Sequence, residues 1–216
     1  MLLVQCDFDD TITVGNVSVL IREAFANDDW RQMEEEYFSG RYSVEESNIR
    51  QFALVRATKS EIEELLAARV VVREGFERFV RSCQSDGIGL VVVSSGLDIY
   101  IDPIMGRLGL AHLDVYSAAA DITGAGIRVE YNDPWGRPLT KGFKDSYLSY
   151  FKGRGHTVVY IGDGLSDIAP AAEADFVIAR SKLKRHFDDN AMPVREFATF
   201  EDVGRHVEEI RGLIEV

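Results

Sequence analysis

The stretch LLVQCDFDDT, which runs from Leu2 to Thr11, is the most informative part of this sequence. A short apolar run of strand-like length ends abruptly in three acids and a threonine. In a parallel sheet, ligands bind just outside the carboxyl ends of the strands, so these acids lie where chemistry is usually carried out. Three carboxylates within four residues repel one another unless they share a cation, and ligation by oxygen alone suits Mg²⁺. An acidic turn that only caps the next helix is the alternative interpretation.

The length and composition of the chain limit its class. A chain of 216 residues can form one α/β domain, or a core domain with a small insert. No apolar run approaches the ~18–20 residues of a membrane span, and no basic-then-apolar signal segment opens the sequence. Two cysteines, Cys6 and Cys83, cannot form a disulfide framework or a structural zinc site, so we expect a cytoplasmic protein. The net charge of −12 argues against nucleic acid as a partner.

Apolar runs and helical patterns alternate along most of the chain. Three segments, 76–83, 143–151 and 203–214, repeat apolar residues at helical spacing. Strands that alternate with helices predict an α/β fold with a Rossmann-like three-layer core, in which helices cover both faces of a parallel sheet. The predicted strands, the last of them weak, are 2–6, 89–94, 113–117, 157–161, 175–179 and 192–197.

Two segments interrupt this alternation. Residues 14–72 contain four short helical patterns and no convincing strand, which predicts a small helical cap inserted into a core made of residues 1–13 and 73–216. Since the segment directly follows the acids, a lid over them is favoured over a purely structural subdomain. Residues 118–140 are poorly periodic and rich in Gly, Asp and Pro, so we expect a loop there, with a hairpin possible between residues 122 and 131.

Three further groups of polar residues follow predicted strands or open predicted helices. Ser94, Ser95 and Gly96 end the second strand and could bind an anion, although Ser-Gly at a strand end usually only caps a helix. Lys144 could offset the charge of a phosphate, although such a lysine is more often solvated. The run GDGLSD, from Gly162 to Asp167, ends the fourth strand in a second pair of acids. Two acidic strand ends in one sheet indicate a metal between them.

The order of acid pair, serine, lysine and acid pair resembles the haloacid dehalogenase superfamily of phosphotransferases over the whole chain. The family's Asp-x-Asp-x-Thr motif stands here as DFDDT from Asp7 to Thr11. Its strand ending in Ser or Thr corresponds to Ser94, its lysine to Lys144, and its Gly-Asp-x-x-x-Asp motif to GDGLSD from Gly162. Lys141 is the less suitable lysine because it precedes the helix pattern.

This resemblance implies a mechanism and a role for each residue. Asp7 is expected to become an aspartyl-phosphate, while Asp9 protonates the leaving alcohol and then activates water. Mg²⁺ is expected to bind Asp7, the backbone carbonyl of Asp9, and Asp163, with Asp167 supporting the water molecules around the metal. The phosphoryl oxygens are expected to contact Ser94, Ser95, Gly96, Lys144 and nearby backbone amides. An acid two residues after the nucleophile separates the superfamily's phosphatases from its dehalogenases.

Within the superfamily, the position of the cap resembles the phosphoserine phosphatase branch, whose small helical cap is of the C1 type. The closest resemblance is to the methionine-salvage phosphatases that act on 2-hydroxy-3-keto-5-methylthiopentenyl-1-phosphate. Besides the segment 7–13, it rests on REGF at 73–76, ARSKL at 179–183 and FATFED at 197–202. The chain departs from that pattern at Asp10 and Ser95, where those enzymes usually have glycine.

Other substrates and one other class remain open. Phosphoserine needs partners for its ammonium and carboxylate, and the chain has Asn16 where a cap glutamate is expected, with Glu23 one or two turns later. Arg50 and Gln51 fall near the position of the expected cap arginine. Loss of a charged partner to a buried ammonium would cost ~3–5 kcal/mol, which disfavours phosphoserine. The remaining alternatives are other small phosphomonoesters and a regulatory protein that binds a phosphorylated ligand without turnover. Nothing in the sequence indicates an oligomeric state.

Overall fold

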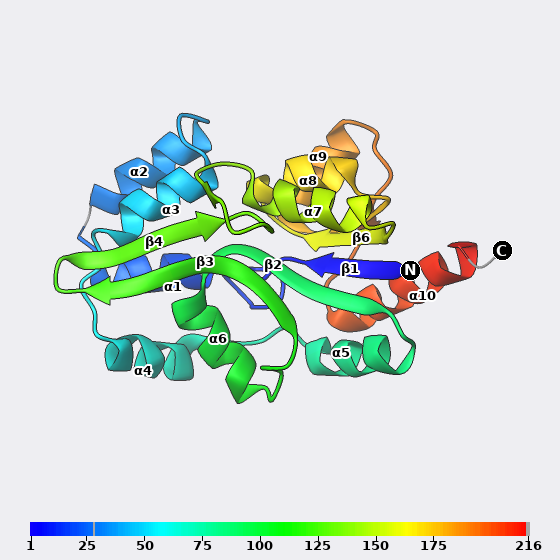
Figure 1. The fold of residues 1–216 in the computed structure, drawn as a ribbon, viewed down its shortest axis with the longest axis horizontal. Coiled ribbons are helices and arrows are strands. Elements are labelled where there is room, and N and C mark those ends of the chain that lie inside the picture. Colours follow the sequence, from blue (N-terminus) through cyan, green and yellow to red (C-terminus); the bar gives the residue numbers. More distant parts are fainter. Residues whose placement is uncertain (28, 215–216) are drawn as a thin grey trace.

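A computed structural model describes residues 1–27 and 29–214 of the chain; residues 28, 215 and 216 belong to the ranges predicted as cap and core and lie outside the described part. Within the described residues, eight strands form one sheet in the order β5-β4-β3-β2-β1-β6-β7-β8 (Figure 1). β1 is central and pairs in parallel with β2 and β6. The strands are β1 Leu2–Cys6, β2 Gly89–Leu97, β3 Asp114–Thr123, β4 Gly126–Asn132, β5 Pro138–Leu139, β6 Thr157–Gly162, β7 Phe176–Ala179 and β8 Arg195–Glu196.

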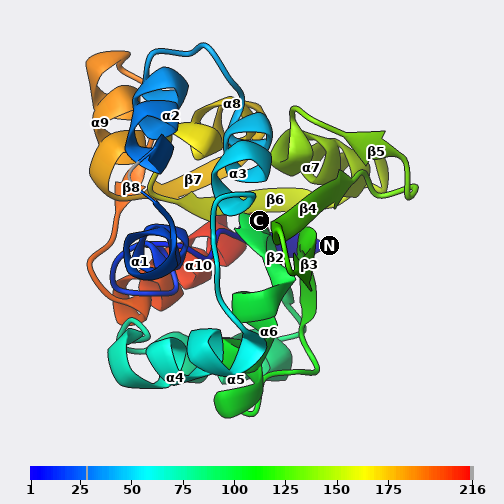
Figure 2. The same ribbon diagram turned by 90° about the vertical axis from the view of Figure 1, so that its left-hand side faces the viewer.

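Helices cover both faces of this sheet. On one face lie α5 (Phe76–Ser85), α6 (Asp98–Arg107) and α10 (Phe200–Ile214), and on the other lie α7 (Phe143–Gly153), α8 (Ile168–Glu173) and α9 (Ser181–Asp189), as Figures 1 and 2 show. The predicted three-layer α/β core is therefore confirmed. The N-terminus and the last turn of α10 lie at the end of the sheet opposite the β3–β4 hairpin (Figure 1).

The central strands are buried because helices exclude water from both of their faces. Val4 and Cys6 of β1 are fully buried, as are Val92 of β2 and Val159 of β6. Continuous apolar runs are typical of parallel strands in such a layer, which is why these strands could be located from the sequence. Their carboxyl ends meet at one edge of the sheet, where the polar residues of the sequence motifs follow.

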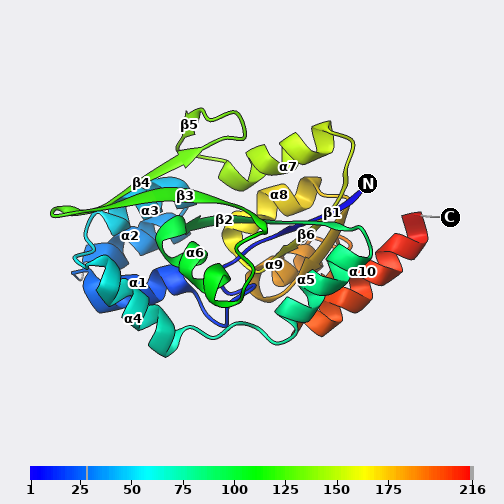
Figure 3. The ribbon, with the colours of Figure 1, turned by 60° about the horizontal axis from the view of Figure 1, so that its bottom comes forward.

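Among the described residues between β1 and α5 there are four helices, as predicted: α1 (Val17–Phe25), α2 (Asp29–Phe38), α3 (Val44–Phe52) and α4 (Lys59–Arg69). α2 packs on α3, and α3 packs on β4, whereas α4 packs on α6 of the sheet's helical layer. Figures 2 and 3 show α4 beside α6 and away from α2 and α3. A capping box of Thr58 and Glu61 opens α4.

The prediction of a loop over residues 118–140 is wrong. β3 continues through Thr123 and forms an antiparallel hairpin with β4, and the short strand β5 pairs with β4 in turn. The hairpin itself was predicted between residues 122 and 131. β3 carries alanines and exposed residues rather than an apolar period, so its sequence gives little strand signal. Burial comes from β4, whose Ile127, Val129 and Tyr131 alternate toward the core.

None of the helices in the described ranges 1–27 and 29–214 is both long enough and apolar enough to cross a membrane.

Candidate active site

The chain turns sharply where β1 ends at the carboxyl edge of the sheet. The backbone N–H of Asp7 bonds the carbonyl of Ile161 on β6 at 2.9 Å, and the N–H of Ile12 then bonds the carbonyl of Phe8 at 2.8 Å. This turn brings the side chains of Asp7 and Asp9 into one cavity, where the two residues are only 5% and 9% exposed. Two buried carboxylates at a strand end require nearby compensation of their charge.

Lys144, at the start of α7, supplies part of that compensation. Its Nζ lies 2.7 Å from Asp7 Oδ1 and 2.6 Å from Asp167 Oδ1. Burial opposes the charge on the lysine, but the carboxylates of Asp167 and Asp7 outweigh burial and raise the pKa of Lys144 overall. The structure thus brings together one predicted residue from each of three elements: the end of β1, α7 and the 3-10 turn η1 (Leu165–Asp167).

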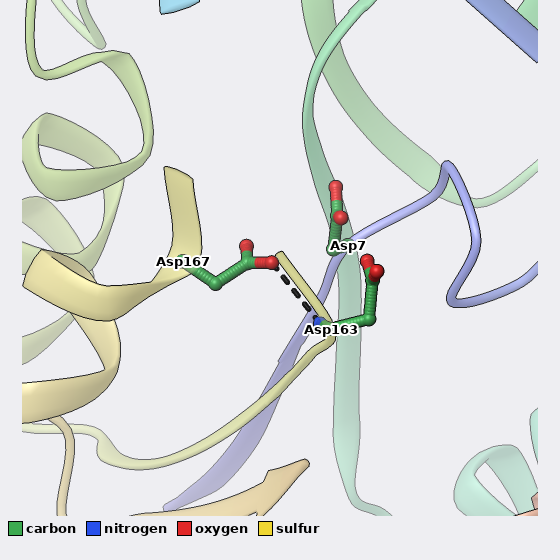
Figure 4. A group of neighbouring side chains, drawn as sticks. All are labelled: Asp7, Asp163 and Asp167. Atoms are coloured by element: carbon green, nitrogen blue, oxygen red, sulfur yellow. Dashed lines mark hydrogen bonds between the residues drawn. The ribbon is translucent and has the colours of Figure 1, made fainter. Parts of the chain in front are cut away.

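Asp167 is fully buried and has a hydrogen-bond donor on every side. Its Oδ1 accepts from Lys144 Nζ and from the hydroxyl of Tyr160 at 2.7 Å. Its Oδ2 accepts from the backbone N–H groups of Asp163 at 3.1 Å and Gly164 at 2.8 Å; Figure 4 shows the first of these bonds. Four donors match the roughly four lone-pair positions of a carboxylate. Asp167 therefore shapes the turn after β6 and fixes Lys144.

The carboxylates of Asp7, Asp163 and Asp167 form a compact acidic group, in which one oxygen from each lies within 4.8 Å of the other two (Figure 4). Lys144 offsets only one of these three negative charges. Burial, together with repulsion from Asp167, raises the pKa of Asp7 to about 7 and that of Asp163 to about 9. An oxygen-only donor set with surplus negative charge fits Mg²⁺, because a divalent cation would relieve this repulsion.

Asp9 is held by partners outside this acidic group. Its Oδ1 accepts from the backbone N–H of Val17 at 2.7 Å, and its Oδ2 accepts from the hydroxyl of Tyr100 at 2.5 Å. Tyr100 also shares a 2.8 Å hydrogen bond with the hydroxyl of Ser18. The metal role predicted for Asp9 concerns its backbone carbonyl, so these side-chain contacts leave that role a prediction.

Ser94, Ser95 and Gly96 all line the cavity. They lie within β2, which continues to Leu97, so they do not cap a helix as the alternative interpretation required. The N–H of Gly96 donates to Ser94 Oγ at 3.0 Å. Ser95 Oγ is buried and has no hydrogen-bond partner among the described residues. A buried hydroxyl without a partner suits an oxygen of a bound ligand.

The cavity has a volume of about 460 Å³ and is closed by the sheet edge on one side and by α1, α2 and α3 on the other. Every predicted site residue except Asp167, which lies behind Lys144, reaches its wall. Most of the side chains that the segment of α1 to α3 contributes are neutral, and two, Arg22 and Glu34, are charged. The full set is Asn16, Ser18, Val19, Arg22, Glu34, Tyr37, Phe38, Val44, Ser47, Asn48 and Gln51.

Arg22 is the principal cavity residue that the sequence analysis missed. The residue is 4% exposed, and its guanidinium carbon lies 5.2 Å from the Trp30 ring and 5.6 Å from the Phe52 ring. Its Nη2 pairs with Glu34 Oε1 at 3.2 Å, while its buried Nε has no hydrogen-bond partner among the described residues. Within the sequence, Arg22 follows an apolar helical stripe and nothing distinguishes it from a surface arginine.

Asn48 was also missed, and it joins α3 to the end of β2. Its Nδ2 donates to the carbonyl of Ser95 at 2.8 Å and to the hydroxyl of Tyr131 at 2.9 Å. The same carbonyl accepts from Tyr131 at 2.6 Å. The two partners of the Ser95 carbonyl are far from it in sequence: Tyr131 lies 36 residues away and Asn48 lies 47 residues away. No local sequence pattern could therefore have revealed these contacts.

The residues weighed for recognition of phosphoserine separate in the structure. Asn16 and Gln51 line the cavity. Glu23 is exposed and borders a different depression, beside Arg69. The guanidinium of Arg50 stacks on Tyr42, 4.3 Å from the ring centre, and does not line the cavity.

Asp10 occupies a position with left-handed backbone, with φ of 56°. This conformation favours glycine, which explains why glycine is usual there in the enzymes that the sequence resembles. The aspartate is held by cations instead: its carbonyl accepts from Arg73 and Arg180, both at 2.8 Å. Arg73 also bonds the carbonyls of Thr11 at 2.8 Å and Ala198 at 3.3 Å. The segments that carry the closest resemblance thus meet around one turn.

Comparison with known proteins establishes the class of this site. The sequence pattern of the haloacid dehalogenase-like hydrolases matches residues 4–172. The chain therefore belongs to the haloacid dehalogenase-like hydrolase family, as its motifs predicted.

Relatives of similar length bear the name 2-hydroxy-3-keto-5-methylthiopentenyl-1-phosphate phosphatase. The protein of that name from Brevibacillus brevis is 31% identical over 97% of this chain and 96% of its own length. That from Geobacillus kaustophilus is 31% identical over 94% of this chain and 93% of its own length. The predicted resemblance to this branch is confirmed.

Solved structures of phosphoserine phosphatases share the fold. A substrate-bound phosphoserine phosphatase complex superimposes with a TM-score of 0.70 and 19% identity, covering 95% of this chain and 97% of the other. A phospho-aspartyl intermediate analogue of phosphoserine phosphatase gives a TM-score of 0.68 and 21% identity, covering 92% and 94%. At these identities the likeness concerns the fold.

Proposed function

We propose that this protein is a Mg²⁺-dependent phosphomonoesterase that hydrolyses a small phosphorylated metabolite through an aspartyl-phosphate on Asp7. The contact between Asp7 and Lys144 carries this proposal. A buried carboxylate at a strand end, 2.7 Å from a buried ammonium, opens into a cavity large enough for a metabolite. The ammonium favours the ionised form of the carboxylate and can meet the charge of an incoming phosphoryl group.

The reaction has two steps. A carboxylate oxygen of Asp7 attacks phosphorus, the bond from phosphorus to the leaving oxygen breaks, and Asp9 gives that oxygen a proton. Water then attacks the phosphorus of the aspartyl-phosphate and gives a proton to Asp9, which releases inorganic phosphate and restores both carboxyl groups. Division of labour between two carboxylates is common in such chemistry.

The other predicted residues hold the phosphoryl group. Lys144, the hydroxyls of Ser94 and Ser95, and the backbone at Gly96 would contact its oxygens. Mg²⁺ held by Asp7, Asp163 and the backbone carbonyl of Asp9, with Asp167 behind them, would neutralise charge as phosphorus is transferred. The carboxylate of Asp167 already accepts four hydrogen bonds, which supports an indirect role for it at the metal.

The division into core and cap is part of this proposal. Residues 1–13 and 73–216 would form the catalytic core, and residues 14–72 the cap that closes over the substrate. The cavity lining from α1, α2 and α3 supports a cap role for these helices. α4 packs on α6, so it would anchor the cap to the core.

For the substrate we propose 2-hydroxy-3-keto-5-methylthiopentenyl-1-phosphate, after the relatives named for it. Phosphoserine is the alternative, and the cavity disfavours it. Among the described cavity residues from the cap, the charged groups are Arg22 and Glu34, and each neutralises the other. A charged amino and carboxyl group would compete with that ion pair for its partners, whereas an uncharged leaving group would not.

Phosphate release tests the proposal. A panel of small phosphomonoesters that includes both candidates would be assayed with Mg²⁺ and with EDTA, for the wild type and for Asp7→Asn. Release that requires Mg²⁺ and disappears in the variant supports the enzyme, and the fastest substrate identifies the branch. Binding of the phosphorylated compounds without release from any of them would favour the regulatory alternative.

A further inference from the structure

The side chain of Asp9 is held by groups outside the sequence motifs. Tyr100 lies on α6, is fully buried, and donates its hydroxyl to Asp9 Oδ2 at 2.5 Å. The opposite oxygen of Asp9 accepts from the backbone of Val17, the first residue of α1. Both carboxylate oxygens are therefore fixed, and the rotation of the group is restricted from two sides.

Tyr100 is itself fixed. Its hydroxyl shares a 2.8 Å bond with Ser18 Oγ, and Ser18 is 5% exposed. The Tyr100 ring packs near the ring of Phe8, 6.3 Å between centres, in the turn that carries the acids. A buried tyrosine with two partners on one hydroxyl cannot rotate without losing both hydrogen bonds. These two bonds therefore fix the position of the hydroxyl.

Gly96 leaves room for this arrangement. A Cβ atom at position 96 would lie 2.1 Å from the Tyr100 hydroxyl oxygen and 2.9 Å from Asp9 Oδ2. Both contacts are shorter than a real Cβ atom makes, so the Tyr100 hydroxyl and the Asp9 carboxylate would have to shift. The glycine after the two serines is therefore needed by the pair of Tyr100 and Asp9, in addition to any contact of its backbone with phosphate.

We propose that Tyr100 is a positioning residue, which holds the Asp9 carboxyl toward the leaving-group oxygen and, through Ser18, couples it to the first turn of the cap. The inference rests on the proposed function. Tyr100 keeps its proton during both steps; the proton given to the leaving oxygen comes from Asp9, and the proton taken from water returns there. A misplaced acid loses catalytic power steeply, because a displacement of ~1 Å can cost on the order of 100-fold.

The test uses the leaving group as a readout. Loss of a correctly placed acid slows the departure of an alkoxide, which needs a proton, far more than the departure of p-nitrophenolate, which does not. Tyr100→Phe should therefore lower kcat/KM for an alkyl phosphomonoester by about 10- to 100-fold, and for p-nitrophenyl phosphate by less than about threefold. Both substrates must be turned over by the wild-type protein.

Tyr131→Phe is the matched control. It removes another buried hydroxyl beside the cavity, one that donates to the Ser95 carbonyl and does not contact Asp9. The ratio of the two kcat/KM values should stay at the wild-type value in this variant. An equal loss on both substrates in Tyr100→Phe, or no loss on either, would overturn the inference.

Ser18→Ala decides the matter if Tyr100→Phe does not fold. It should lower kcat/KM for the alkyl phosphomonoester relative to p-nitrophenyl phosphate by about threefold, because Tyr100 loses one of its two hydrogen-bond partners. An unchanged ratio would overturn the inference. If the wild type releases no phosphate from any ester, the proposed function fails; if it does and the ratio does not respond, only the role of Tyr100 fails.

Discussion

The two walls of the cavity differ in how they are built. On the core wall, Asp7, Asp163 and Lys144 come from loops and a helix at the edge of the parallel sheet, and Lys144 pairs with Asp7. On the cap wall, α1, α2 and α3 present neutral hydroxyl and amide groups, apolar side chains, and one ion pair that is internally neutral. The core wall gathers charge, whereas the cap wall contributes almost none.

This difference indicates a division of tasks. Groups whose charge changes during phosphoryl transfer should affect turnover, because they interact most strongly with the transition state. Neutral groups that meet the rest of the substrate should affect binding in the ground state and the transition state equally, which changes KM. Four experiments can break or sharpen this contrast, beginning with the largest expected effect.

Asp7→Asn should abolish turnover, with a loss of at least ~10⁴-fold, because the amide cannot attack phosphorus. Steady-state phosphate release measures the loss, and circular dichroism confirms that the fold is retained. Acid-quenched wild-type protein should carry phosphate on Asp7, and the variant should carry none. Substantial turnover in the variant would exclude the covalent route.

Removal of metal should have the next largest effect. With EDTA, phosphate release should fall by at least ~100-fold, because the buried acids repel one another and then lack the cation that offsets their charge and that of the phosphoryl group. Added Mg²⁺ should restore the rate, and Asp163→Asn should need a higher Mg²⁺ concentration for half of the maximal rate. Full activity in EDTA would contradict the metal assignment.

Replacing the ion pair of the cap wall should act on binding. In the double variant Arg22→Met/Glu34→Gln, KM should rise by about tenfold while kcat changes by less than about threefold, because donors that face the leaving group are lost. The matched control is Arg41→Met/Glu36→Gln, which removes an exposed ion pair from the same region with no contact to the cavity. A fall in kcat at constant KM would assign Arg22 to the chemistry instead.

The smallest effect should lie far from both walls. Asp202 caps α10 by accepting from the backbone N–H groups of Ala198 and Thr199, and these bonds lower its pKa from 3.8 to about 2. A lowered pKa means that the carboxylate stabilises the fold above pH ~4 and that this contribution is lost as the pH falls toward 2.

Asp202→Ala should therefore lower the free energy of unfolding at pH 7 by about 1 kcal/mol, a shift in Tm of roughly 2–4 °C, with kcat unchanged. Thermal unfolding at pH 7 and near pH 2 measures the difference, which should disappear at the lower pH. Glu208→Ala, which removes an exposed partner of Arg211, serves as the control. An equal loss of stability at both pH values would show that the stabilisation of the α10 N-terminus by Asp202 does not depend on the charge of its carboxylate.

The sequence predicted the core wall far better than the cap wall. Asp7 and Asp163 each follow an apolar strand, and parallel strands in one sheet bring their ends together, so local patterns were enough to place them. Lys144 was harder, since its partners Asp7 and Asp167 lie far away in sequence. In the sequence Lys144 looks like a solvent-exposed lysine, but in the structure it is buried between these two carboxylates.

The contacts that could not be predicted join segments that are far apart in sequence and that share no repeating pattern of apolar residues. Tyr100 reaches Asp9 across 91 residues, on a helix that contains Pro103 and gave no clear pattern. Arg22 depends on Trp30 and Phe52, which became its neighbours only through packing of α1 to α3. β3 became a long strand because β4 covers it, not because its own alanines favour one.

The turn that follows β1 has a consequence for how the protein forms. Its backbone carbonyls are held by Arg73 and Arg180, and Arg73 reaches on to Ala198. β1 itself pairs with β2 and with β6, so the first residues of the chain acquire their last neighbours from near its other end. Such long-range pairing is slow, because loops must close before contacts can compensate for the lost entropy. During synthesis, residues 7–11 are therefore complete long before they can form a site, because Lys144, Asp163 and Arg180 are added later.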